Sequence, residues 1–198
     1  MRVYGGLQKG VLWLCLCQCV ACVAPLANIP SDYRFMRDTG VIVLSLTATG
    51  ECGFAYFTDI RDMYADASYS IGMQDSGRER DWRKQGTDCP SGPHDFFGKL
   101  VVIELPAGTY QMTSFVGMRA DKQVCSKQDM RIDFTVVPGK LNYLGNIHFH
   151  VNKTNFIYGG ADERQRDISL FQKKYPQFRQ TDIIMNLLRI KTLRNIAA

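Results

Sequence analysis

The feature that most constrains the fold is a strand-like plan that occurs twice, each time around a proline and a glycine. Residues 100–118 read LVVIELPAGTYQMTSFVGM, in which an apolar run leads to Pro106 and Gly108 and alternating apolar and polar residues follow. Residues 131–151 repeat this plan around a Pro-Gly pair that ends at Gly139. Period-two alternation is typical of strands with one buried face, and proline with glycine suits a tight turn. The sequence therefore predicts two β-hairpins, with positive φ at both glycines.

Further strands and a helical end complete the expected architecture. Shorter apolar runs predict strands at residues 41–48, 54–58, 67–73 and 155–158. Apolar residues then recur at helical spacing up to Pro176, and Thr181 is placed to cap a second helix. We expect a mainly β fold, an antiparallel β-sandwich over residues 41–158, with one or two C-terminal α-helices in residues 159–198 packing on it.

The N-terminus has the composition of an export signal. Residues 1–21 carry Arg2 and Lys9 without an acid, and their apolar run is shorter than the roughly 20 residues that span a bilayer as a helix. The run ends in CVAC, where a small residue directly precedes Cys22, as in the bacterial lipobox. This pattern predicts a signal peptide over residues 1–21 and lipidation of Cys22. Cleavage a few residues further on by ordinary signal peptidase, and an uncleaved anchor, are the alternatives.

Lipidation would place the mature chain in a cell envelope, with residues 22–40 as its lipidated N-terminus and tether. Val23 directly after the lipidated cysteine favours the outer membrane, facing the periplasm. Removing Arg2 and Lys9 from 24 basic residues leaves 22, against 19 acidic residues, a formal charge of +3. These charges are scattered, which does not favour nucleic acid as a partner. The expected partners are the membrane, through the lipid anchor, and an envelope protein or glycan.

Three cysteines lie beyond the predicted lipidation site: Cys52, Cys89 and Cys125. In an oxidising periplasm one pair can form a disulfide and leave one thiol over. Cys89 and Cys125 both lie in polar, turn-rich stretches that flank the central hairpin, so they are the preferred pair. The mature chain has no CxxC motif, which gives no support to a zinc ribbon or a thioredoxin-like redox site. We expect no cofactor.

Two histidines give the sharpest chemical signal. His148 and His150 lie two residues apart on a predicted strand and therefore project from the same face, which is the spacing that a metal chelate uses. A polar, solvent-facing strand also accounts for them, because Asn146 and Asn152 share their parity. A metal site needs a third ligand, and the remaining histidine, His94, lies in a distant loop. Periplasmic metal binding through this pair is kept as an alternative function.

The long loop between the predicted strands holds a possible binding loop of Arg80, Trp82 and Arg83. Long loops are commonly functional, and a tryptophan among arginines could stack on a glycan or a protein partner. Such a tryptophan also often folds back onto its own domain. Ser91 and His94 are close in sequence, but there is no GxSxG elbow and no order that fits a catalytic triad. We therefore predict no catalytic residues and no enzyme, with an envelope hydrolase as the remaining alternative.

Four segments carry a resemblance to a protein family: GVIVLSLTATG, LPAGTY, FTVVPGKLNYLG and ERQRDISLFQKKYP. Spanning about residues 41–176, they resemble a group of uncharacterised proteobacterial lipoproteins. The resemblance implies a transthyretin-like or immunoglobulin-like β-sandwich that often ends in one or two helices. The shared segments are turn and core residues, so the resemblance implies a fold and no particular chemistry. We expect a lipid-anchored cell-envelope protein with a binding or structural role.

Overall fold

The computed structural model describes residues 29–30, 32–50, 55–74, 82–83, 97–119, 122–125, 131–151, 155–179, 181–190 and 193–196. The predicted features that lie outside these residues are the signal peptide, Cys22, Cys52, Arg80, Cys89 and His94. Cys125, Trp82 and Arg83 are described by their backbone alone. Among the described residues, no helix is long and apolar enough to cross a membrane.

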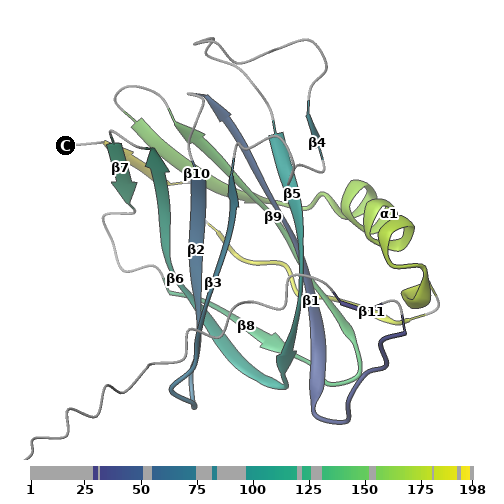
Figure 1. Ribbon diagram of the computed structural model, residues 1–198. Coiled ribbons are helices and arrows are strands. Elements are labelled where there is room, and N and C mark those ends of the chain that lie inside the picture. Colours follow the sequence, from purple (N-terminus) through teal and green to yellow (C-terminus); the bar gives the residue numbers. More distant parts are fainter. Residues whose placement is uncertain are drawn as a thin grey trace, which may run out of the picture.

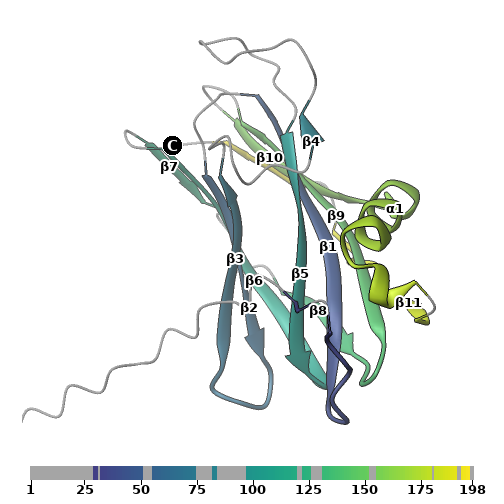
Figure 2. The ribbon, with the colours of Figure 1, turned by 45° about the vertical axis from the view of Figure 1, so that its right-hand side comes forward.

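Most of the described chain forms strands, which confirms the expectation of a mainly β fold. Sheet A runs in the order β12 (Leu193–Ile196), β10 (Asn155–Ala161), β9 (Leu141–Val151), β1 (Thr39–Gly50), β5 (Phe97–Pro106) and β4 (Trp82–Arg83), with β11 (Ile183–Met185) also beside β9. Sheet B runs in the order β3 (Ser68–Gln74), β2 (Ala55–Asp62), β6 (Gly108–Arg119) and β7 (Lys122–Cys125), with β8 (Ile132–Val136) also beside β6. Figure 1 shows both sheets, and Figure 2 shows them as two layers.

One hydrophobic core fills the space between the two sheets. Sheet A contributes side chains such as Leu44 and Phe149, and sheet B contributes Tyr56 and Phe115. All four are fully buried. The Tyr56 ring stacks on the Phe149 ring with centroids 5.0 Å apart, and the Phe115 ring meets Phe149 edge-on at 5.4 Å. Aromatic contacts thus join the two layers directly.

A second hydrophobic cluster covers the other face of sheet A. Val43 of β1 and Tyr143 of β9 point away from sheet B, and Phe171 of α1 (Arg164–Lys174) and Phe178 of the 3₁₀ helix η1 (Pro176–Phe178) pack against them. Figure 2 shows α1 on this outer side of sheet A. The first predicted C-terminal helix is therefore confirmed, and it lies on the sheet as expected.

The expectation of a purely antiparallel arrangement is wrong for sheet A, which is mixed. β1 pairs with β5 in the antiparallel sense, but it pairs with β9 in parallel, and β11 also pairs with β9 in parallel. The described pairs of sheet B are antiparallel. Alternation in a sequence shows which residues share a face and carries no information on strand direction. The sequence pattern therefore could not predict that these strand pairs are parallel.

Neither predicted hairpin forms. β5 belongs to sheet A and β6 to sheet B, so the turn at Pro106 carries the chain from one layer to the other. β8 and β9 are joined across the layers in the same way. Crossing puts the apolar faces of both strands into one core, whereas a hairpin would leave them side by side in one layer. Gly139 has the predicted positive φ, +68°, but Gly108 does not have a positive φ.

The second predicted C-terminal helix does not form either. Thr181 is followed by β11 and then by extended chain up to Ile190. The backbone amide of Asn186 donates to the carbonyl of Tyr143 at 2.9 Å, and its side chain donates to the carbonyl of Thr135 in sheet B at 2.7 Å. β9 pairs with β10 through its second half, and its first half pairs with this segment instead. Hydrogen bonds to the edge of the sheet therefore override the helical spacing of the sequence.

Part of the expected tether packs on the domain. Ile29 is buried in the second hydrophobic cluster. The rings of Tyr33 and Phe35 contact the ring of Phe178, with centroids 5.6 and 5.5 Å apart. Ile29 is the first residue that the structure describes, and it lies seven positions after Cys22 in the sequence.

Candidate functional site

A polar ladder runs along the face of sheet A that points away from sheet B. The parallel register of β1 and β9 places three hydroxyl side chains beside three nitrogen-bearing ones: Ser45 beside Asn146, Thr47 beside His148, and Thr49 beside His150. Side chains alternate between the two faces of a strand. The residues between the rungs, such as Leu46 and Ile147, therefore belong to the core. We call the six outward residues the polar ladder.

Helix α1 closes the buried end of the ladder with a carboxylate. Asp167 is fully buried, and its Oδ2 accepts hydrogen bonds from Ser45 Oγ at 2.6 Å and from Tyr143 Oη at 2.8 Å. Arg166 Nε donates to Asp167 Oδ1 at 2.8 Å, and the Arg166 Nη2 donates to Ser45 Oγ at 3.0 Å. Burial, and then the hydrogen bond to Asp167, raise the pKa of the Tyr143 hydroxyl, so that this group stays protonated and donates. The buried charge is thus paired and hydrogen-bonded, as its burial requires.

Sequence reasoning missed Asp167. The available signal was its spacing, because Asp167 lies four residues before Phe171 and residues four apart share one face of a helix. Both are fully buried. An acid on the buried face of a helix indicates a hydrogen-bonded partner on the element beneath it. Here that element is the β1–β9 pair.

Asn146 connects the buried end of the ladder to the histidines. Its Nδ2 donates to Ser45 Oγ at 2.8 Å and to Thr47 Oγ1 at 3.1 Å. Thr47 Oγ1 lies 2.9 Å from His148 Nδ1. A hydroxyl at this distance from an imidazole nitrogen has the geometry of a nucleophile beside its base. Thr47 is only 1% exposed, however, so a substrate atom would not reach its hydroxyl.

His148 lies at the half-buried part of the ladder, where its surroundings disfavour the protonated ring. Its Nδ1 faces Thr47, and its Nε2 lies 3.1 Å from Thr49 Oγ1, which in turn lies 3.0 Å from His150 Nδ1. Burial, and then the electrostatic influence of His150 and Arg166, lower the pKa of His148 below its ordinary value. Both ring nitrogens of His148 are therefore engaged with hydroxyl groups.

The histidine pair shares one face, as predicted, but the described residues around it do not complete a metal site. A chelate through His148 would have to replace the contact between one of its nitrogens and Thr47 or Thr49. Among the described residues, no group of three or more His, Cys, Asp and Glu side chains could hold a metal ion. Within that part of the chain, the pair is a hydrogen-bonding surface that ends at His150.

The strand register brings the other candidate into the same row of the sheet. β4 pairs with β5 so that Trp82 lies opposite Gly98, Gly98 pairs with Thr47, and Thr47 pairs with His148. The row continues onto β10, where Gly159 pairs with His148. Strands β4, β5, β1 and β9 lie side by side in Figure 1. Two candidates that are far apart in the sequence thus share one row, with glycines at two of its positions.

The remaining predicted residues are not brought together in the described part of the chain. Cys125 lies in β7, on sheet B, and its proposed partner Cys89 lies outside the described residues. The disulfide therefore stays a prediction. Arg83 follows Trp82 in β4, opposite Phe97.

Comparison with known proteins does not place the chain in a family. No protein-family model matches the sequence, and no curated protein matches it either. Among solved structures, the chain is similar to a leucine-rich repeat protein from Bacteroides thetaiotaomicron, with 16% sequence identity and a TM-score of 0.34. The match covers 58% of this chain and 14% of that protein. A likeness of this size carries no argument on fold or function.

Proposed function

We propose that the chain is a lipid-anchored, periplasm-facing protein of the outer membrane whose domain binds an envelope glycan. The domain is proposed to be a β-sandwich of the transthyretin-like or immunoglobulin-like type. Two layers that share one core support this assignment, and the lipobox-like sequence before Cys22 supports the anchor.

The row from Trp82 to His148 is the observation that favours a glycan. A sugar ring presents an apolar face and a rim of hydroxyl groups. Tryptophan supplies an aromatic surface for the apolar face, and the half-buried end of the ladder offers the Thr49 hydroxyl and the His150 imidazole to the rim.

Co-sedimentation with insoluble cell-wall glycan tests this binding. The full protein in detergent is compared with Trp82→Ala and His150→Ala, and with Tyr64→Ala as a matched control, because Tyr64 is an 88% exposed aromatic residue in the β2–β3 turn. Loss of a central aromatic residue at a binding site commonly costs about 2 kcal/mol or more. Trp82→Ala should therefore bind at least about tenfold more weakly, and Tyr64→Ala should bind like the wild type. Equal binding by all variants, or none by the wild type, would contradict the glycan proposal.

The anchor is tested separately through Cys22. Its thiol is the acceptor for the lipid, and attachment by more than one acyl chain is durable. In Cys22→Ser, the protein should leave the membrane fraction and accumulate unprocessed or soluble. A mutant that matures and fractionates like the wild type would show that Cys22 is not lipidated.

A further inference from the structure

The first described segment has one face turned to the domain and one to solvent. Along residues 33–36, half-buried Tyr33 and Phe35 alternate with exposed Arg34 and Met36. The two aromatic rings rest on Phe178, as described above. Met36 is 62% exposed although methionine is an apolar residue. The segment is therefore fixed on its inner face and presents a cation and an apolar side chain outward.

The end of α1 and the start of η1 lie beside this segment. The side chain of Gln177 donates to the carbonyl of Pro30 at 3.0 Å, and Gln177 lies in η1, which directly follows the last turn of α1. This contact and the ring contacts of Phe178 place the end of η1 beside residues 30–35, and exposed cations flank the contacts on both segments. We define the anchor-side patch as the exposed residues Arg34, Met36, Arg37, Lys173, Lys174 and Arg179.

The anchor-side patch carries an excess of positive charge. It holds five cations, and the two acids of residues 29–38 and 173–179 are Asp32 and Asp38. These two segments therefore have a formal charge of +3, and Glu104, whose carboxylate acts on the Tyr33 hydroxyl, adds one acid beside them. The ion pairs within the described residues do not involve Arg34, Arg37, Lys173 or Arg179. Their charges are thus available to an anionic partner.

The position of the anchor identifies that partner. If Cys22 carries the lipid, as proposed above, Ile29 follows it by seven residues, which span at most about 25 Å when fully extended. Ile29 packs in the same cluster as Tyr33, Phe35 and Phe178, whose chain neighbours Arg34, Met36 and Arg179 belong to the patch. We infer that the anchor-side patch docks on anionic lipid headgroups of the membrane that holds the anchor. The acyl chains provide attachment, and the patch sets which side of the domain faces the bilayer.

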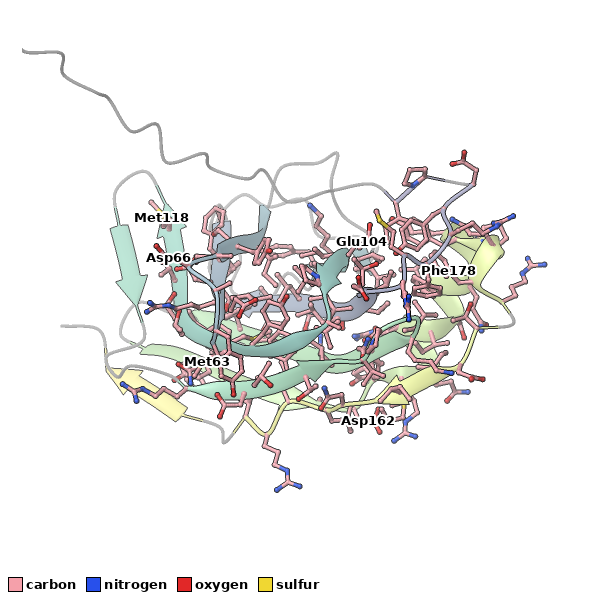
Figure 3. The ribbon with its side chains drawn as sticks, turned by 90° about the horizontal axis from the view of Figure 1, so that it is seen from below. Met63, Asp66, Glu104, Met118, Asp162 and Phe178 are labelled. Atoms are coloured by element: carbon pink, nitrogen blue, oxygen red, sulfur yellow. The ribbon has the colours of Figure 1, made fainter. Side chains whose placement is uncertain are left out.

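The cations of the patch and the short distance to the anchor both favour this docking. A lysine or arginine at an anionic membrane surface strengthens binding by about fivefold. A tethered surface also meets its partner at a high effective concentration, so that several weak contacts suffice. Met36 supplies an apolar side chain that would enter the headgroup region. Figure 3 shows Phe178, which underlies the patch, and Met118 of β6 at opposite ends of the domain.

Photo-crosslinking in the full, lipidated protein tests this orientation. A photoreactive residue replaces Met36 in one variant and Met118, which is 45% exposed, in the other. Each variant is reconstituted in nanodiscs of phosphatidylcholine, with or without phosphatidylglycerol. The Met36 variant should crosslink to lipid several-fold more than the Met118 variant, and only when phosphatidylglycerol is present. Equal crosslinking from both positions, or crosslinking of Met36 to a protein in native envelopes but not to lipid, would overturn the inference.

A charge-reversal pair isolates the role of the cations. Arg34→Glu with Arg37→Glu should lower the lipid crosslinking of the Met36 variant at least tenfold. Arg61→Glu with Arg131→Glu makes the same change in net charge at two exposed arginines of the sheet B side and should leave it unchanged. An equal loss from both pairs would mean that net charge, and not this patch, is responsible. Intact mass reports acylation in every sample, so a missing lipid, which would overturn the anchor itself, is distinguished from an anchored domain that does not dock.

Discussion

Removal of the Asp167 carboxylate should destabilise the domain more than any exposed acid does. In Asp167→Ala, the hydroxyls of Ser45 and Tyr143 and the guanidinium of Arg166 lose the acceptor that they now share at 2.6–2.8 Å. Tyr143 and Ser45 are both fully buried, so water cannot replace that acceptor without a rearrangement of α1.

The expected cost follows from the number and burial of these groups. A buried donor left without a partner costs about 1–3 kcal/mol, and removing one partner of a buried ion pair typically costs about 3–5 kcal/mol. Because Arg166 keeps part of its exposure and can turn to water, we expect about 3–5 kcal/mol in the free energy of unfolding. For a domain of this size, 1 kcal/mol corresponds to roughly 2–4 °C. The thermal midpoint should therefore fall by about 6–20 °C.

Thermal and urea unfolding of purified protein measure this effect. Asp133→Ala is the matched control, because Asp133 is exposed and accepts a hydrogen bond from Gln111 at 2.8 Å on the surface. It should change the free energy of unfolding by less than about 0.5 kcal/mol. Asp167→Asn keeps one acceptor oxygen and nearly the same volume, and should lie between the two. If Asp167→Ala and Asp133→Ala unfold together, the carboxylate does not hold α1 on the sheet.

Two further predictions concern a turn and a titrating group. Gly139→Ala should lower the free energy of unfolding by about 1 kcal/mol or more, because φ is +68° at this position. Gly108→Ala should leave the thermal midpoint unchanged, since φ is not positive there and the nearest atom to an added Cβ is 3.7 Å away. Equal effects of the two substitutions would contradict these backbone conformations. The lowered pKa of His148 means that the unfolded chain takes up a proton more readily than the folded one, so stability should decline as pH falls from the ordinary histidine value of 6.5 toward the folded pKa. In His148→Gln, the contribution of His148 to this loss of stability should be absent when the free energy of unfolding is measured in urea between about pH 8 and about pH 5. The same pH dependence in the variant and the wild type would refute this prediction.

The sequence predicted which face of a strand is buried better than it predicted which strands pair. The alternation of Ile42, Leu44 and Leu46 correctly indicated one buried face of β1, and all three are fully buried in the core. Alternation is a property of one strand, whereas pairing depends on which strands meet. The joins at Pro106 and Gly139 were therefore interpreted as hairpins, although they cross between the sheets.

In the segment after Thr181, pairing with the edge of a sheet overrides the helical pattern of the sequence. Its apolar residues, such as Ile184, Leu187 and Leu188, have helical spacing. In the extended chain, Leu188 and Ile190 pack against the core instead. A short isolated helix is marginally stable in water, while an edge strand gains backbone hydrogen bonds and also satisfies those of its neighbour. Pairing with β9 thus determines the conformation of this segment, for which the sequence alone indicated a helix.

The sequence predicted that Asn146, His148 and His150 share one face, but the rest of the polar ladder could not be predicted because it depends on one irregular position in β9. Leu141 and Tyr143 share the odd parity of Ile147 and Phe149, which suggested a single buried face. The register shifts between Val43 and Leu44, where β1 passes from Tyr143 to Gly145. Gly145 has φ +96°, and an added Cβ would lie 3.0 Å from the carbonyl oxygen of Ala161.

This extra residue inverts the parity of the strand. Before the shift, Tyr143 faces the cluster under α1, and after it the odd-numbered Ile147 and Phe149 face the core between the sheets. The even-numbered Asn146, His148 and His150 therefore turn to the outer face. Because β1 and β9 run in parallel, the polar half of each strand meets the polar half of the other, whereas an antiparallel pair would place His150 opposite the apolar start of β1. Strand direction and one glycine, neither of which alternation reveals, together create the surface on which the proposed function rests.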